Sequence, residues 1–334
     1  MGTQKNLKKL LVLGTGGTIA GKAEDRADNV GYRPAQLDIG QLLNALPGLD
    51  ARLGAHAMHC EQVAQVDSKD MSFAIWRELA LRLSTQLSRA DVSGAVITHG
   101  TDTLEETAYF LHRVLPHVVL RKKPVVLTCA MRPASSENPD GPQNLLDAVT
   151  VALDRQASGV LVVCAGVVHG ALDVQKVHTY RLDAFSSGDA GPIAFVEEAA
   201  LRVLRAWPVA DSEQTPSRLQ GLLAQAQWPR VDIVMNYAGV GGEPVLSMLR
   251  DRAAKSRLKG LVVAGTGNGT VHEDLSRALE KAQLAGVRVV RTSRCANGRV
   301  LASGRNEFSA ATGLSAPKAR IELMLKLFES ASLA

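Results

Sequence analysis

The chain has 334 residues, of which 46% are hydrophobic and 21% charged, and its formal net charge is +5. A chain of this length exceeds what one hydrophobic core usually spans, so we expect two domains, and the composition excludes a disordered protein. Apart from Lys8-Lys9 and Arg121-Lys122-Lys123 the basic residues are scattered, and aromatic residues make up only 4%, so no nucleic-acid partner is predicted.

Short apolar runs alternate with helical periodicity along the first two thirds of the chain. Strands are predicted over 10–13, 94–98, 124–128 and 160–164, and helices over 41–46, 71–87, 104–115 and 144–153. Repeated alternation of strand and helix is typical of a mostly parallel sheet covered by helices on both faces.

A segment rich in turn-forming residues, over 208–229, interrupts this rhythm. Strands are predicted after it over 231–235, 260–264 and 287–290, and helices over 244–254, 271–284 and 318–328, with one or two helical turns over 219–226 inside the segment. The sequence therefore predicts an α/β fold of two α/β domains with mostly parallel sheets. The larger N-terminal domain covers 1–207, a linker covers 208–229, and the smaller C-terminal domain covers 230–334.

The sequence does not predict a membrane protein, a metal site or a disulfide framework. No apolar run approaches the ~20 residues that a membrane span needs. The four cysteines form no CxxC pair, so neither a zinc site nor a disulfide framework is predicted. The basic start before Leu10 resembles that of a signal peptide, but the apolar part is too short. A cytoplasmic protein is expected, and a periplasmic one stays open if an upstream signal has been removed.

The first predicted strand ends in the glycine-rich run Gly14-Thr15-Gly16-Gly17. A dinucleotide-binding pattern would need glycine or alanine where Ile19 stands, and no Gly-Lys-Ser/Thr follows, so no nucleotide cofactor is predicted. What remains is the hydroxyl of Thr15 between glycines that let a ligand approach the backbone, or else a plain turn threonine. The polar stretch over 22–29, closed by Tyr32, is predicted to form a mobile lid over it.

A second cluster of polar residues follows the strand over 94–98. Thr103 and Glu106 have the spacing of a capping box, which would place Thr101 and Asp102 at a helix N-terminus, where backbone N–H groups favour negative charge. His99 is either a base or, more in keeping with its place at a strand end, a hydrogen-bonded structural residue.

A third polar loop, Gly265-Thr266-Gly267-Asn268-Gly269-Thr270, follows a strand of the second domain. Its glycines imply a tight turn that presents the Asn268 amide as donor and acceptor. A purely turn-forming asparagine is the equally plausible alternative.

The first two loops closely resemble the two signature motifs of bacterial-type L-asparaginases. The resemblance covers nearly the whole chain in order, because it continues through Ala130-Met131-Arg132-Pro133, Asp140-Gly141-Pro142, Asp173-Val174-Gln175-Lys176, the Asn268 loop and Pro317-Lys318-Ala319-Arg320. It implies two α/β domains with the larger one first. It also implies a hydrolase, free of cofactor and metal, that cleaves the side-chain amide of L-asparagine, with L-glutamine as a second substrate.

The resemblance also implies catalytic roles. Thr15 would be the nucleophile that forms an acyl-enzyme, and Tyr32 on the lid would be its activating partner. Thr101, Asp102 and Lys176 would form a second polar triad, and which of its members moves the proton at each step stays open.

Substrate-binding residues are implied in the same way. Ser68 would hold the α-carboxylate and Asp102 the α-ammonium, and Gly100, Thr101 and Ala130 would also contact the substrate. Backbone N–H groups near Thr101 at the helix start, close to Ala130, are candidates for holding the oxyanion. Asn268 matches a residue that family members contribute from a neighbouring subunit, so a homotetramer is implied.

Two positions depart from the family pattern. Lys69 stands where relatives commonly have glutamine or glutamate facing the α-ammonium, so we expect Lys69 to turn toward the α-carboxylate or toward solvent and to weaken affinity or alter specificity. The segment over 294–316 looks short, and Glu307 is the candidate for the acidic residue that relatives use there.

Three other functions compete with L-asparagine hydrolysis. The nearest is a glutaminase-asparaginase or an enzyme for another small amide. The second is a binding protein that has kept the fold and lost turnover. The third, a nicotinamide-dependent oxidoreductase, is disfavoured by Ile19 in the glycine-rich run.

Overall fold

The computed structural model describes residues 7–208, 219, 221–222, 227–251, 257–301 and 308–332. The chain divides into two compact units, Met1–Leu219 and Gln220–Ala334. Most of the predicted linker over 208–229 lies outside the described residues; of the helical turns predicted over 219–226, residues 219, 221 and 222 are described and helical.

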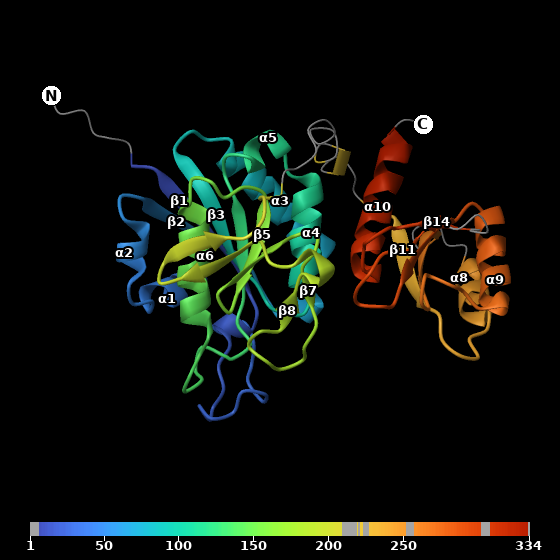
Figure 1. Cartoon of the computed structure of the whole chain (residues 1–334), viewed down its shortest axis with the longest axis horizontal. Helices are drawn as coiled ribbons and strands as arrows, with labels where there is room; N and C mark the ends of the chain where they lie inside the picture. Colours follow the sequence, from blue (N-terminus) through green and yellow to red (C-terminus); the bar gives the residue numbers. More distant parts are fainter. Residues whose placement is uncertain are drawn as a thin grey trace. The chain divides into compact units, whose positions relative to one another are not determined.

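An eight-stranded mixed sheet forms the centre of the first unit (Figure 1). Its strand order is β10-β9-β6-β5-β4-β3-β1-β2. The strands are β1 (Lys9–Gly16), β2 (Ala57–Val66), β3 (Val92–Thr98), β4 (Val125–Thr128), β5 (Val160–Cys164), β6 (Val167–Gly170), β9 (Ala194–Glu197) and β10 (Ala200–Val203). Pairs among β1 to β5 are parallel, and the pairs beyond β5 are antiparallel. The predicted α/β class with a mostly parallel sheet is confirmed.

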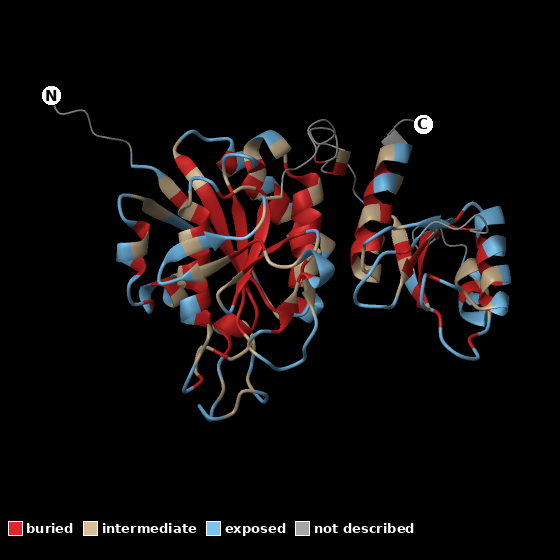
Figure 2. Ribbon diagram, viewed as in Figure 1, coloured by how far each residue is buried: buried red, intermediate tan, exposed pale blue. Residues whose placement is uncertain are grey.

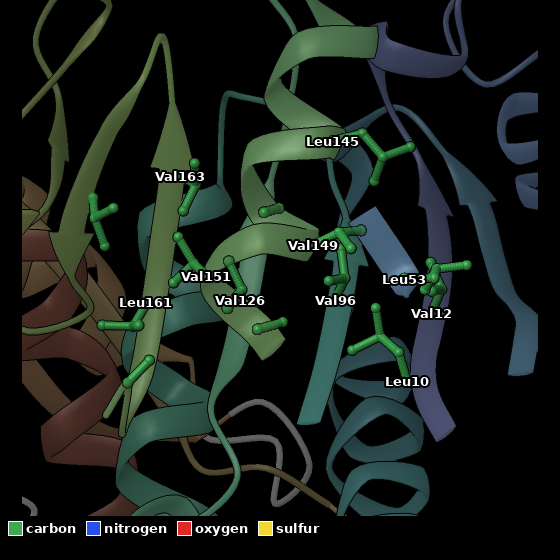
Figure 3. Packing of buried hydrophobic residues seen from close by; sticks show 14 of the residues in the cluster. Leu10, Val12, Leu53, Val96, Val126, Leu145, Val149, Val151, Leu161 and Val163 are labelled. Carbon is green, nitrogen blue, oxygen red and sulfur yellow. The ribbon is translucent and has the colours of Figure 1, made fainter. Parts of the chain in front are cut away.

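Helices cover both faces of this sheet. The helices are α1 (Ile39–Asn44), α2 (Leu49–Leu53), α3 (Phe73–Leu87), α4 (Leu104–Val114), α5 (His117–Leu120) and α6 (Gly141–Leu153). Leu10 and Val12 of β1 lie in one buried cluster with α1, α2 and α6 (Figure 3). The intervening Leu11 and Leu13 are also buried, and because side chains alternate along a strand they face the opposite layer. The strands are therefore buried on both sides, as their continuous apolar runs predict.

The second unit contains a four-stranded parallel sheet in the order β11-β12-β13-β14. Its elements are β11 (Arg230–Met235), α8 (Glu243–Arg250), β12 (Leu258–Gly265), α9 (Glu273–Leu284), β13 (Arg288–Ser293), β14 (Ser309–Ala310) and α10 (Ala316–Ser332). Apolar residues of α8 and α9 share one core with the sheet, whereas α10 packs on β11, β12 and β13 from the other face (Figure 1).

Several elements of the first unit were not predicted from the sequence. The edge strand β2 and helix α2 are absent from the predicted set, and so are all the strands that follow β5. Two of these, β7 (Gln175–Lys176) and β8 (Phe185–Ser186), form a separate two-stranded sheet, and β7 carries a residue of the candidate site.

Burial follows this layered architecture (Figure 2). The central strands are red along most of their length, whereas exposed residues concentrate in the loops and on the outer helix faces. Among the described residues, no helix has the length and apolar character needed to cross a membrane.

Candidate active site

The polar residues singled out in the first unit follow the carboxyl ends of neighbouring parallel strands. Thr15 lies at the end of β1, Ser68 lies just after β2 in the 3-10 turn η2 (Ser68–Asp70), Thr101 follows β3, and Ala130 follows β4. Because these strands are parallel, their carboxyl ends meet at one edge of the sheet, which is where ligands bind in open α/β folds.

Two glycines bring the first two loops into direct contact. Gly17 has φ +82°, and a Cβ built on it would lie 2.4 Å from both the Cα and the N of Gly100. A Cβ on Gly100 would in turn lie 2.5 Å from the Ser68 Oγ. These positions accept only glycine without a shift of the backbone, so the sequence Gly16-Gly17 allows the threonine loop to pack against the Thr101 loop.

The hydroxyl of Thr15 is buried, with only 1% of the residue exposed. It donates a hydrogen bond of 2.9 Å to the carbonyl of Thr98 on the neighbouring strand β3. The nucleophile candidate is therefore held in one orientation, with its proton directed at a backbone carbonyl.

Lys176, Thr101 and Asp102 form a connected triad. The Nζ of Lys176 lies 2.7 Å from Thr101 Oγ1 and 2.7 Å from Asp102 Oδ1. The Lys176 side chain is 19% exposed, whereas that of Asp102 is 51% exposed. The backbone N–H of Lys176 also donates to the Glu105 carboxylate at 2.6 Å, which fixes β7 against the start of α4. The structure thus brings together the three residues that the family resemblance groups.

Ser68 links η2 to the loop that precedes α4. Its hydroxyl oxygen accepts the Asp102 N–H at 3.1 Å, and its carbonyl accepts the hydroxyl of Thr103 at 2.7 Å. The predicted capping box at Thr103 and Glu106 is therefore wrong. Thr103 is the N-cap residue of α4, but its side chain makes no capping hydrogen bond because it is used to hold Ser68.

His99 is a buried structural residue, as the second of the two interpretations of the sequence expects. Its Nδ1 lies 2.7 Å from the carbonyl of Gly100, which can only accept, so Nδ1 carries the proton. Its Nε2 then accepts from the Thr107 hydroxyl at 2.9 Å, and the Thr107 oxygen accepts the indole N–H of Trp76 at 2.8 Å. Complete burial lowers the pKa of His99 to about 4, so the ring is neutral.

Tyr32 approaches the site from the lid segment. Its hydroxyl lies 2.6 Å from Thr18 Oγ1, and the structure shows no hydrogen bond between the hydroxyls of Tyr32 and Thr15, both of which are described. Burial raises the pKa of Tyr32, and the carboxylates of Asp67 and Asp102 raise it further, against the opposing hydrogen bond from Thr18. The phenol is therefore protonated at neutral pH.

The lid itself is tied at both of its ends. Lys22 and Arg33 pair as a short antiparallel bridge, and the N–H of Ala23 donates to Ser135 Oγ at 2.8 Å. In Figure 1 this segment is the blue loop at the bottom of the first unit. Its mobility stays a prediction.

Lys69 turns toward two neighbouring carboxylates. Its Nζ lies 2.6 Å from Asp70 and 3.2 Å from Asp67, and its side chain is 62% exposed. Hydrogen bonds to these carboxylates raise the pKa of Lys69, so the charge is present and locally paired.

Ala130 lies in a small buried cluster with Ile19 and Ala20, beside the threonine loop. The backbone beyond it is held by Asp140, whose two carboxylate oxygens each accept one N–H at 2.9 Å, from Met131 and Arg132. This rigid support explains why the segment Ala130-Met131-Arg132-Pro133 keeps its place at the end of β4.

Asn268 belongs to the second unit. Its side-chain oxygen accepts the Leu301 N–H at 2.7 Å and its amide donates to the Leu301 carbonyl at 3.2 Å, so the side chain clamps two loops of that unit. Glu307 lies outside the described residues.

Sequence reasoning missed two residues of this site. Thr18 is the partner of the Tyr32 hydroxyl, and Glu105 anchors the Lys176 backbone. Thr18 lies inside the glycine-rich run and could have been noticed as a second buried hydroxyl. Glu105 gave no separate signal, because an acidic residue in a first helical turn is ordinary.

The described part of the chain contains no group of side chains that indicates a metal site or a disulfide. Among the described residues, no cluster of three or more His, Cys, Asp or Glu side chains could hold a metal ion. The four cysteines are free, with Cys129 and Cys164 buried as the sequence predicts.

Comparison with known proteins places the chain in a family. A family model described as the N-terminal part of asparaginase matches residues 9–208, and one described as the glutaminase/asparaginase C-terminal domain matches residues 230–334. A probable periplasmic L-asparaginase of Haemophilus influenzae is 36% identical over 97% of this chain and 90% of its own length. The glutaminase-asparaginase of Pseudomonas fluorescens is 33% identical over 97% of this chain and 88% of its own.

A solved structure agrees with these matches. The crystal structure of a probable cytoplasmic L-asparaginase from Campylobacter jejuni superposes with a TM-score of 0.86 at 33% identity, covering 96% of this chain and 95% of that one. The chain therefore belongs to the asparaginase–glutaminase family of hydrolases.

Proposed function

We propose that this chain hydrolyses the side-chain amide of L-asparagine to L-aspartate and ammonia through an acyl-enzyme on Thr15. The observation that carries the proposal is the triad in which the Lys176 Nζ lies 2.7 Å from both Thr101 Oγ1 and Asp102 Oδ1, beside a buried threonine hydroxyl. Amide hydrolysis needs a nucleophile, proton-transfer groups and an oxyanion site, and this edge of the sheet offers a candidate for each.

In the first step the Thr15 Oγ1 attacks the amide carbon of the substrate. The Oγ1–C bond forms, the Thr15 proton leaves, and the amide oxygen becomes an oxyanion. Collapse breaks the C–N bond, and ammonia departs with an added proton, which leaves a β-aspartyl ester on Thr15. Tyr32 is protonated at neutral pH. It therefore serves here as a proton carrier: it donates its own proton to the leaving nitrogen and accepts the proton that leaves Thr15.

In the second step water attacks this ester. The triad is suited to act on that water, because Lys176 donates to the Thr101 oxygen while the Thr101 hydroxyl donates to Asp102 Oδ1 at 3.4 Å, so the three polar groups are linked in one network. The C–Oγ1 bond breaks, L-aspartate forms, and Thr15 regains its proton.

The oxyanion is assigned to the backbone between β3 and α4. The Asp102 N–H already donates to Ser68, whereas the N–H groups of Gly100 and Thr101 have no hydrogen-bond partner among the described residues. Ala130 lies buried at the adjacent strand end. Free donors at the start of a helix stabilise developing negative charge, since they need no reorganisation.

Charge pairing accounts for substrate recognition. The Asp102 carboxylate, about half exposed, would pair with the α-ammonium, and the Ser68 hydroxyl would receive the α-carboxylate. Lys69 is held by Asp67 and Asp70, which offset the repulsion that its ammonium would exert on the α-ammonium of the substrate.

The test is ammonia release from L-asparagine by the wild type, Thr15→Ala and Thr15→Ser. We expect the alanine variant to lose several orders of magnitude in rate, on the ~10⁶ scale of a removed serine-enzyme nucleophile. The serine variant keeps a hydroxyl and should retain measurable turnover. A wild type that is inactive on asparagine, or an alanine variant as active as the wild type, would contradict the proposal.

L-glutamine is the alternative substrate, because relatives that include the Pseudomonas fluorescens enzyme carry the name glutaminase-asparaginase. Glutamine needs room for one more methylene, and pockets discriminate such a difference by only ~10–200-fold. Turnover of both substrates by the same preparation measures the ratio directly.

We further propose a homotetramer in which Asn268 completes the site of a neighbouring subunit. Asn268 presents its loop from the second unit and is exposed, although its amide is bonded to Leu301. Light scattering tests the subunit number. Mixing inactive Thr15→Ala with inactive Asn268→Ala subunits tests the shared site, since mixed oligomers regain intact sites only if Asn268 acts across subunits.

A cytoplasmic location is also part of the proposal. It is supported by the solved relative from Campylobacter jejuni, which carries the name probable cytoplasmic L-asparaginase, whereas the Haemophilus influenzae relative carries the name periplasmic, so a periplasmic location is the alternative. Fractionation of cells that produce the full-length protein tests this assignment.

A further inference from the structure

A cavity lies at the edge of the first unit opposite to the candidate active site. Its volume is about 560 Å³, within the range of small-molecule pockets. Its walls come from the segments that precede β1, β2, β3 and β4 and from the end of α6, near the place where β1 begins and α5 lies in Figure 1. Because the active-site residues follow the carboxyl ends of these strands, the two sites are at opposite ends of the sheet.

The two basic runs of the sequence meet at this cavity. Lys8 comes from the run before β1, and Lys122 and Lys123 come from the run before β4, more than one hundred residues away; Arg155 adds a fourth cation from the end of α6. The sequence alone suggested scattered charge, because these runs are far apart along the chain.

Most of these cations have no competing partner. Among the described residues, the side-chain charges of Lys8, Lys122 and Arg155 form no ion pair or hydrogen bond, whereas Lys123 donates to the backbone carbonyls of Leu87 and Arg89. Burial lowers the pKa of Lys123 and the nearby charge of Lys8 lowers it further, against the opposing effect of the Asp91 carboxylate.

Only one carboxylate opposes this positive charge on the cavity wall. Asp154 lines the cavity, but its Oδ1 accepts the backbone N–H groups of Gln156 at 2.7 Å and Ala157 at 3.2 Å, so it caps the chain after α6. His56 also lines the cavity. Its Nδ1 lies 3.2 Å from the Leu53 carbonyl, so Nε2 is the ring nitrogen that can contact a ligand.

We propose that this cavity binds a small anion that carries two or more phosphate groups. Four cationic side chains that converge from separate segments favour a ligand with several negative charges. Three of the four are lysines, whose ammonium groups bind phosphate as point charges, and the guanidinium of Arg155 is of the kind that can donate two hydrogen bonds to one phosphate. The concave shape favours a small molecule over a nucleic-acid strand, which needs an extended basic track.

Titration calorimetry with inorganic pyrophosphate at constant physiological ionic strength tests the proposal. We expect saturable binding of one pyrophosphate per chain to the wild type. Each charged contact removed should raise Kd by roughly tenfold or more. The double variant Lys8→Ala/Lys122→Ala, which removes two contacts, should therefore bind roughly a hundredfold more weakly. Both lysines are exposed, so the variant is expected to fold.

The matched control is Lys259→Ala/Lys281→Ala, which removes the same net charge at two exposed positions of the second unit. It should bind pyrophosphate like the wild type. Equal weakening in the control, the absence of saturable heat, equally tight binding of citrate, or tighter binding of a single-stranded oligonucleotide would each overturn the proposal.

The rate of asparagine hydrolysis distinguishes a failure of this inference from a failure of the proposed function. Because the cavity and the active site lie at opposite ends of the strands, Lys8→Ala/Lys122→Ala should retain the wild-type rate. The binding measurement needs no turnover, so its outcome stands even if the substrate assignment is wrong.

Discussion

Acidification should destabilise the protein through His99. The neutral ring joins Trp76 and Thr107 to the carbonyl of Gly100, in the loop that carries Thr101. Protonation of Nε2 would turn an acceptor into a donor facing the Thr107 hydroxyl, inside a fully buried site. The folded protein therefore resists protonation of this ring, whereas the unfolded chain does not.

The magnitude follows from the two pKa values. Burial lowers the pKa of His99 from 6.5 to about 4, so the folded state binds fewer protons than the unfolded state as the pH falls through this window. The contribution to stability is complete above pH 6.5 and is lost progressively toward pH 4. The loss at pH 5 is about 2 kcal/mol and below pH 4 about 3 kcal/mol, at ~1.4 kcal/mol for each pH unit.

Urea unfolding at pH 7.5 and pH 5, followed by circular dichroism at one protein concentration, measures this loss. The comparison is between the wild type and His99→Gln, which cannot titrate. Carboxylates contribute equally to both proteins, so the wild type should lose about 2 kcal/mol more than the variant between the two pH values. Equal losses in the two proteins would refute the reasoning.

Three substitutions probe the geometry of the site. Gly17→Ala should cost at least about 2 kcal/mol in urea unfolding, because its Cβ would meet the Gly100 backbone at a positive φ; a near-neutral result would contradict the close packing. Thr103→Val should lose about 1 kcal/mol and raise KM by releasing Ser68, with Thr103→Ser restoring both. Lys69→Gln should lower KM for asparagine by less than about tenfold, since this ammonium is already paired; unchanged KM and substrate preference would dismiss any role for it.

Much of the fold could be predicted because its central strands are continuous apolar runs. Residues 160–164 are all buried, and the periodic helix over 71–87 begins only two residues later, where Ser72 caps it. The edge strand β2 was missed because it is half exposed and lacks clear alternation. The β9–β10 hairpin turns at Glu198 and Ala199, which adopt positive φ without the glycine or asparagine that normally announces such a turn.

The site was predictable where the residue types are unusual and unpredictable where they are ordinary. Thr15, Thr101 and Asp102 stand in dense polar loops, and resemblance supplied Lys176, which lies in a two-residue strand with no signal of its own. The partner of each hydroxyl could not be predicted, because Thr103 fits a capping box in sequence but reaches Ser68 in space. Tyr32 likewise meets Thr18, a contact that depends on the path of the lid.

The central claim is that Thr15 carries the acyl group, and trapping that intermediate tests it most directly. Acid quench of the enzyme during turnover of L-asparagine, followed by proteolysis and mass spectrometry, locates any β-aspartyl ester. We predict the ester on the peptide that contains Thr15, at the Thr15 oxygen, and none in Thr15→Ala. An ester on Thr101 or Thr18, or turnover with no covalent intermediate at Thr15, would contradict the account.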